Sequence, residues 1–163
     1  MTEHHLAQLN IARLRAPLED PSMAEFAQNL ARINGLGDTS PGFVWRLQDE
    51  SGDATGLEQP FGDGVIVNLT VWADVESLRR FTYKSEHAGF VRRRGAWFVP
   101  LDGPHLVLWW IPAGHLPTLS EAKERLDRLA TEGPCPEAFL FARAFDPAGT
   151  PLRRGAATIE RSA

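Results

Sequence analysis

The sequence has a single cysteine, Cys135, in a chain of 163 residues. One cysteine excludes an internal disulfide and a cysteine-based zinc site, and it fits a reducing compartment. No apolar run approaches the ~20 residues that a membrane helix needs, and the N-terminus has no basic segment followed by an apolar core. We therefore expect a cytoplasmic protein with no membrane partner.

Basic charge is also scarce. The chain has 17 lysines and arginines against 21 aspartates and glutamates, a formal charge of −4, so a nucleic acid is not expected as its partner. The one dense basic run, Arg92-Arg93-Arg94, can hold an anion, although such runs more often lie at a solvated helix end. We keep Arg94 as a candidate ligand contact. No metal-binding triad is visible at usable spacing.

Apolar residues, by contrast, make up 43% of the chain, enough for the core of one domain. We expect this domain to span residues 1–145 and to be followed by a loosely ordered tail, 146–163, which is rich in Pro, Gly, Arg and Ala. The order of periodic segments within the domain predicts its fold.

Alternating or dense apolar patterns predict strands over residues 5–14, 43–48, 65–72, 106–111 and 138–145. Capping boxes at Ser22–Glu25 and Thr118–Glu121 predict the starts of two helices, and Asp74 caps a third that runs to Arg94. Gly35 or Gly37 is expected to end the first helix, and Gly133 the last.

This order is β-α-β-β-α-β with one additional helix and strand, which predicts an α+β, ferredoxin-like fold with an antiparallel sheet. Two helices would cover one face of that sheet. The other face also carries apolar residues, so a second copy is expected to cover it, which predicts a homodimer in the form of a dimeric α/β barrel.

A long pattern in the sequence resembles domain-of-unknown-function family 3291, over residues 5 to 145. It consists of Val71-Trp72, Leu78, Phe81, Tyr83, His87, Trp97-Phe98, the run from Leu108 to Gly114, Pro117-Thr118, Glu121-Ala122, Arg125-Leu126, Gly133-Pro134 and Ala138-Phe139. The resemblance implies a dimeric α/β barrel and brings no settled activity. The wider superfamily includes antibiotic-biosynthesis monooxygenases, which oxidise anthrones without metal or flavin, haem-binding members and plain binding proteins. Fold alone therefore does not decide the chemistry.

Asn68 and Trp72 are four residues apart on one predicted strand, so their side chains share a face, and Asn10 is another amide among apolar neighbours. The set is similar to the Asn and Trp residues that anthrone oxygenases place around their substrate. An amide donates a hydrogen bond to a developing enolate oxygen, and a tryptophan gives a flat substrate a dry wall. The alternative is that Asn68 satisfies neighbouring groups and Trp72 is core.

Tyr83 and His87 share one side of a predicted helix, and His87 is the best candidate for a general base or for a haem ligand. Alternatively, His87 is a structural histidine at a helix break. Trp97, Trp45 and Trp109 or Trp110 can line a site for a planar ligand, although tryptophans more often fill cores. We carry Trp97 and Trp110 as candidate substrate contacts.

Three functions remain open. The first is a cofactor-independent oxygenase or isomerase that acts on an aromatic or polyketide-like molecule, with His87, Asn68 and Trp72 as catalytic residues and Asn10, Tyr83, Trp97, Trp110 and Arg94 as substrate contacts. The second is a haem protein. The third is a non-catalytic small-molecule binder or dimeric interaction module, in which His87 and Tyr83 point to solvent and the tryptophans are fully packed.

Overall fold

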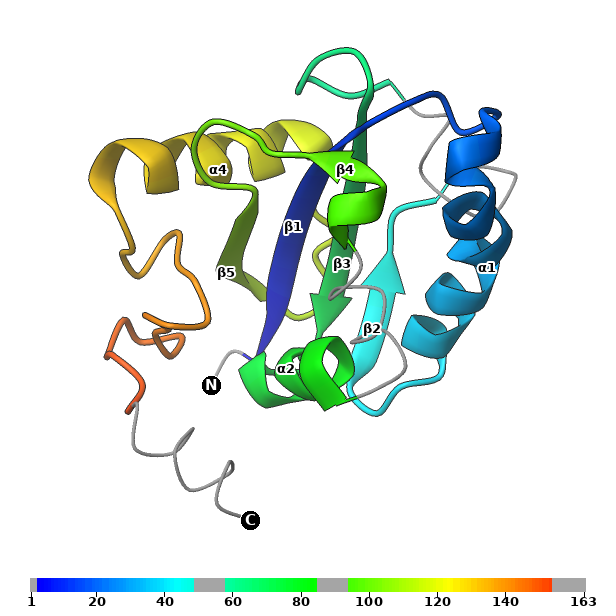
Figure 1. Cartoon of the computed structure of the whole chain (residues 1–163). Coiled ribbons are helices and arrows are strands. Elements are labelled where there is room, and N and C mark those ends of the chain that lie inside the picture. The colour runs from blue at the N-terminus through cyan, green and yellow to red at the C-terminus, as the bar shows by residue number, and fades with distance from the viewer. Residues whose placement is uncertain (1–2, 49–57, 85–93, 154–163) are drawn as a thin grey trace.

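The computed structural model describes residues 3–48, 58–84 and 94–153 of the chain. The elements in these residues are β1 (His4–Leu14), η1 (Pro21–Met23), α1 (Ala24–Asp38), β2 (Phe43–Arg46), β3 (Val65–Trp72), α2 (Val75–Lys84), η2 (Arg94–Ala96), β4 (Phe98–Val99), β5 (Leu106–Pro112) and α4 (Leu119–Glu132) (Figure 1). The predicted α+β order, with an additional helix after the ferredoxin-like unit, is confirmed.

The sheet has five strands and is antiparallel, with β1 at its centre. β1 pairs with β3 on one side and with β5 on the other, and β2 lies outside β3. β4, which the sequence did not predict, pairs with the last residues of β1. Since β5 takes the place of the fourth ferredoxin-like strand, the order across the sheet, β5-β1-β3-β2, is that of the split βαβ fold.

One face of the sheet, here called the odd face, carries Ala7, Leu9 and Ile11 of β1 together with alternate residues of β3 and β5. The additional helix α4 covers it with Ala122, Leu126 and Leu129, and α4 passes behind the sheet in Figure 1. The odd-face residues of β1 are buried within a single chain. Burial of this face therefore does not require a second copy, and that argument for a homodimer is wrong, because it left out α4.

The even face carries Leu6, Gln8 and Asn10 of β1 and belongs to a second apolar cluster. There Leu6, Trp72 and Leu108 pack with residues of α2 and of the C-terminal segment, Val75, Leu78, Phe139, Ala144 and Phe145. Asp74 caps α2 as predicted, because its Oδ1 accepts a hydrogen bond from the Ser77 amide at 2.8 Å. α2 is described as far as Lys84, and its predicted continuation over residues 85–93 lies outside the described residues.

Trp109 and Trp110 are adjacent on β5 and point to opposite faces, as predicted. The Trp109 indole is buried under α4 and donates its Nε1 hydrogen to Glu121 Oε2 at 2.9 Å. Thr118 caps α4, since its hydroxyl accepts from the Glu121 amide, and Gly133 ends the helix with a positive φ of 76°. Glu121 thus links the start of α4 to the core tryptophan of β5.

Other details differ from the predictions. The predicted capping box at Ser22–Glu25 is wrong. Asp20 is the capping residue, because its Oδ1 accepts from the Ser22 amide at the start of a 3-10 turn, and α1 follows that turn without a side-chain cap. Gly35 and Gly37 lie inside α1, which ends at Asp38. At Gly37 a methyl group would lie 3.5 Å from the Phe81 ring, an ordinary van der Waals contact, so α1 and α2 pack against each other at this point.

The predicted last strand over residues 138–145 is wrong. This segment makes isolated bridges, of which Leu108↔Phe139 lies on the outer edge of β5. Ala138, Phe139, Ala144 and Phe145 are nevertheless buried, which explains the strand-like pattern. Residues 146–153 continue in a turn closed by Asp146, so the predicted boundary at residue 145 stays a prediction. In the described part of the chain, no helix has the length and apolar character needed to cross a membrane.

Candidate functional site

Two asparagines face each other at the centre of the even face. Asn10 of β1 and Asn68 of β3 are register partners, and Leu106 of β5 is the partner of Asn10 on its other side. Both asparagines are exposed, although they lie on inner strands whose neighbouring rungs are largely buried. Neither side chain has a hydrogen-bond partner among residues 3–48, 58–84 and 94–153. The predicted common face of Asn68 and Trp72 is confirmed by the strand geometry.

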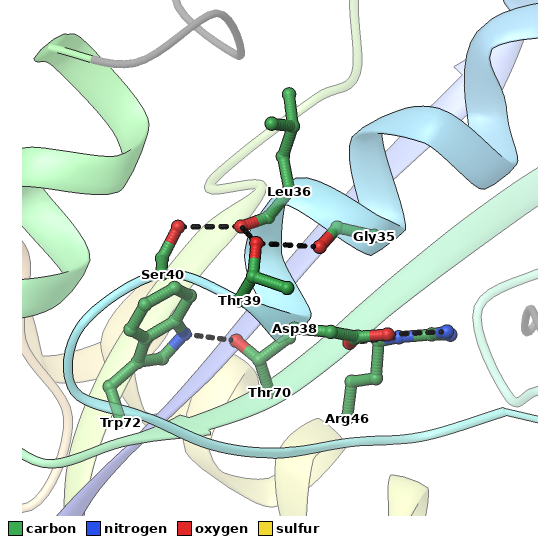
Figure 2. Close-up of polar contacts among 8 residues, drawn as sticks. All are labelled: Gly35, Leu36, Asp38, Thr39, Ser40, Arg46, Thr70 and Trp72. Carbon is green, nitrogen blue, oxygen red and sulfur yellow. Dashed lines mark hydrogen bonds and ion pairs between the residues drawn. The ribbon is translucent and has the colours of Figure 1, made fainter.

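A buried chain of hydrogen bonds occupies the next rungs of the same face. Trp72 Nε1 donates to Thr70 Oγ1 at 2.9 Å, and the Thr70 hydroxyl donates to Gln8 Oε1 at 2.7 Å. Figure 2 shows the first of these bonds, with the Trp72 indole pointing toward Thr70. The Gln8 and Thr70 side chains are each about 95% buried, and they are register partners one rung from the two asparagines.

Trp72 itself is a core residue, with 1% of its surface exposed. Its ring stacks on Phe81 and meets Phe43 edge-on, at centroid separations of 5.2 and 5.4 Å. Its indole hydrogen is already used by Thr70. Trp72 therefore supports this face through Thr70 and Gln8, and the described packing leaves little of the ring free to serve as a wall.

Helix α1 lies beside β2 and is held near both ends (Figure 1). Phe26 packs against Trp97 and Phe98, at centroid separations of 5.6 and 5.2 Å. Near the other end, Gly37 meets Phe81, and Asp38 binds Arg46 of β2 through two contacts of 2.7 and 3.2 Å (Figure 2).

Between these anchors, Leu30 and Ile33 lie on the same helical stripe as Phe26 and Gly37, at intervals of three and four residues. Both are partly buried, and neither belongs to the two core clusters of the sheet. The middle of α1 thus presents two partly buried apolar side chains that belong to neither core cluster, on the same stripe as Phe26 and Gly37.

The remaining predicted site residues are spread over the domain. Tyr83 is 54% exposed and meets Phe141 edge-on, Trp97 is buried against α1, and Trp110 donates its indole hydrogen to the Phe145 carbonyl at 2.7 Å. Arg94 begins η2. His87 lies outside the described residues, as do Arg92 and Arg93.

Two open depressions are lined by residues other than the two asparagines. One, of about 480 Å³, lies between residues 58–60 and α4, and the other, of about 530 Å³, lies between Leu18, Glu19 and the start of β3. Acidic side chains line both. The described parts of the chain contain no group of three His, Cys, Asp or Glu side chains placed to hold a metal ion.

Sequence reasoning missed Gln8 and Thr70. Their signal was present, since polar residues alternate at Gln8-x-Asn10 and Asn68-x-Thr70 within otherwise apolar strands. What could not be read was the register that places Gln8 opposite Thr70 and Asn10 opposite Asn68.

The fold defines a ferredoxin-like α+β domain with amides exposed at the centre of one sheet face. The family model described as Domain of unknown function (DUF3291) matches residues 5–154. The chain therefore belongs to this family, as its sequence pattern indicated.

Solved structures give distant likenesses. A mutant of SnoaB, a cofactor-independent oxygenase from Streptomyces nogalater, is 18% identical, with 69% of this chain and 95% of that chain covered and a TM-score of 0.43. The NE2512 protein of unknown function from Nitrosomonas europaea is 15% identical, with 72% and 99% covered and a TM-score of 0.45. PA3566 from Pseudomonas aeruginosa is 16% identical, with 72% and 97% covered and a TM-score of 0.39. No curated protein matches.

Proposed function

We propose that the chain binds a small aromatic carbonyl compound on the even face and oxidises or isomerises it without a cofactor. The observation that carries the proposal is the pair Asn10 and Asn68, which are exposed on adjacent inner strands and have no hydrogen-bond partner among the described residues. Asparagines at such positions do not serve the core, and polar groups converging beside apolar side chains are typical of ligand sites.

The chemistry follows from what amides do to a carbonyl. When a base removes a proton from the carbon of an anthrone methylene, negative charge develops on the carbonyl oxygen, and an amide N–H stabilises it. The resulting carbanion reacts with molecular oxygen. One oxygen atom becomes the new carbonyl of an anthraquinone, and the other leaves as water with both methylene hydrogens.

The base that the sequence predicts is His87, which lies outside the described residues. Its role is supported by its chemistry, because the imidazole titrates near neutral pH. If His87 is the base, kcat/KM for the wild type rises with pH through the range near pH 6.5, whereas the His87→Gln variant loses this dependence. Arg94, Tyr83, Trp97 and Trp110 stay proposed substrate contacts, to be tested by single substitutions.

A second candidate is non-catalytic binding of the same kind of compound. The exposure of Tyr83 and the packing of Trp72 and Trp97 favour it, since the binding alternative predicted both. Both candidate functions place the ligand on the even face, and only the catalytic one converts the ligand to a product. A ligand that binds without oxygen consumption supports the binder.

Haem is the remaining alternative, and it depends on His87. Among the described histidines, His115 bonds Glu121 at 2.7 Å, at the far side of the domain from the asparagines. Titration with haemin tests this alternative, because a haem site produces a sharp Soret band and saturates at one haem per chain, and absence of that band excludes it.

The test of catalysis is oxygen uptake with dithranol, a dihydroxyanthrone that is converted to danthron, the corresponding dihydroxyanthraquinone. An oxygenase raises the rate of oxygen consumption above spontaneous oxidation, and danthron forms in equal amount. A rate equal to that of heat-denatured protein contradicts the catalytic proposal.

The homodimer and the cytoplasmic location also stay proposals. The family resemblance supports pairing, and the single cysteine supports a reducing compartment. Light scattering after size-exclusion chromatography tests the first, with 18.1 kDa expected for a monomer and twice that mass for a dimer.

A further inference from the structure

Gln8 has a buried amide group whose hydrogens have no acceptor in the described part of the chain. Its side chain is about 95% buried, and its Oε1 accepts from Thr70. No acceptor for Nε2 is found among residues 3–48, 58–84 and 94–153. A buried donor without an acceptor costs about 1–3 kcal/mol, so such groups in native proteins generally meet water or a ligand.

The orientation of this amide is fixed by its neighbours. The Trp72 indole can only donate, so Thr70 Oγ1 must accept from it, and the Thr70 hydrogen remains for Gln8. If the Gln8 amide were turned over, its NH₂ would face Thr70 and the buried Thr70 hydrogen would lose its acceptor. The chain Trp72→Thr70→Gln8 therefore holds Oε1 toward Thr70 and leaves Nε2 as the free end.

Gln8 shares a sheet face with the two asparagines. Gln8 and Asn10 are alternate residues of β1, so their side chains leave the same face about 7 Å apart. Asn68 is directly across from Asn10. The three side chains, here called the amide patch, combine one fixed, buried donor with two exposed amides. A fused-ring compound that carries oxygens on adjacent rings is large enough to span the distance of about 7 Å between the Gln8 and Asn10 side chains.

We propose that Gln8 Nε2, oriented by the Trp72→Thr70 hydrogen bonds, donates to an acceptor oxygen of the bound ligand and so selects carbonyl or phenolate compounds over apolar compounds of the same shape. The inference deepens the proposed function and rests on it. Gln8 is a ligand-binding residue, and Thr70 is the positioning residue that acts through it.

The test compares two probes of similar shape, danthron, which carries oxygens, and anthracene, which carries none. Binding is followed by quenching of tryptophan fluorescence in the full chain. Gln8→Met, which keeps the length of the side chain and removes the amide, is expected to weaken danthron binding about tenfold, the equivalent of one hydrogen bond. It leaves anthracene binding within about twofold.

Thr70→Val keeps the Gln8 amide but removes the hydrogen bond that orients it. This variant provides the test if Gln8→Met does not fold. Its danthron affinity is expected to fall about threefold to tenfold, again with anthracene unchanged. Equal danthron affinity in the wild type and in the folded variants overturns the inference, and so does an equal loss for both probes.

Asn68→Ala distinguishes a failure of the inference about Gln8 from a failure of the proposed function. If danthron binds the wild type and Asn68→Ala weakens it while Gln8→Met does not, the site stands and the role of Gln8 is wrong. If the wild type does not bind danthron at all, both the site and the role of Gln8 are wrong.

Discussion

Asn10 and Asn68 are direct cross-strand partners, and both are exposed at the centre of a sheet whose adjacent rung, Gln8 with Thr70, is buried. The even face thus changes from buried to exposed between two alternate residues of β1, Gln8 and Asn10. Helix α1, which lies beside β2, is anchored near its ends by Phe26 and by Asp38, and its middle apolar residues belong to neither core cluster. This relationship underlies the proposed site.

Replacing either asparagine by alanine should weaken ligand binding without unfolding the protein. Asn68→Ala and Asn10→Ala each remove an exposed amide that has no partner in the described structure, so we expect stability changes within about 0.5 kcal/mol. Danthron affinity, measured by fluorescence quenching, should fall about fivefold to tenfold in each variant.

The matched control is Gln28→Ala, which removes an exposed amide from the solvent side of α1. Its danthron affinity should equal that of the wild type. A loss as large as that of Asn68→Ala would mean that the effect does not arise at the even face.

The buried chain on the even face should contribute measurably to stability. Thr70→Val leaves the Trp72 N–H and Gln8 Oε1 without partners, and we expect it to lower the free energy of unfolding by about 2–3 kcal/mol. Thr39→Val, which removes an exposed hydroxyl near the end of α1, should cost less than about 1 kcal/mol. Urea titrations compare the two, and equal losses would contradict the importance of the chain.

Glu121 should make stability depend on pH at the acid end. Partial burial acts to raise its pKa, but the hydrogen bonds from His115 and Trp109 and the charges of His115 and Arg125 outweigh it, so the pKa lies below its ordinary value. Because the folded pKa is the lower one, the ionised carboxylate stabilises the fold at neutral pH. This contribution is fully present above the ordinary glutamate pKa of 4.5 and is lost as the pH falls below it, through the lower folded pKa.

Glu121→Gln removes the charge and keeps an oxygen for the Trp109 indole. We expect it to lower stability by about 0.5–1 kcal/mol at neutral pH, a small value because His115 is partly exposed, and the difference from the wild type should shrink toward pH 3. Urea unfolding at several pH values measures this. Glu124→Gln, at an exposed position of the same helix, should show no such trend.

Two glycines should respond in opposite ways to alanine. Gly42 has a φ of +85°, and a Cβ there would clash with the Ser77 side chain, so Gly42→Ala should cost at least about 2 kcal/mol. Gly35 lies inside α1 with open space around its Cβ position, so Gly35→Ala should stabilise the protein by about 0.5–1 kcal/mol. Thermal unfolding of both variants checks the pair, and a stable Gly42→Ala would show that this turn can rearrange.

Local patterns predicted the main elements well. The dense β-branched run over residues 65–72 forms β3 with the predicted bounds, and Thr118 and Asp74 cap helices because each has an amide donor in reach. Alternation also assigned the two faces of β1 and the opposite directions of Trp109 and Trp110.

Predictions failed where two neighbouring residues could both cap a helix, and where tertiary contacts determine the local structure. Asp20 and Ser22 both suit a cap, and the local backbone selects Asp20. Residues 138–145 have the burial pattern of a strand, but tight turns within the segment interrupt the pairing. Cross-strand register is a tertiary property, so the sequence supplied Asn10 and Asn68 separately, without the contact between them or the role of Gln8.

Oxygen uptake with dithranol tests the central claim most directly, when measured for the wild type and for Asn68→Ala side by side. The account predicts that wild-type protein consumes oxygen faster than heat-denatured protein, with one danthron formed for each oxygen molecule, and that Asn68→Ala is at least about tenfold slower. Oxygen consumption at the spontaneous rate, or an unchanged rate in Asn68→Ala, would contradict catalysis at the even face.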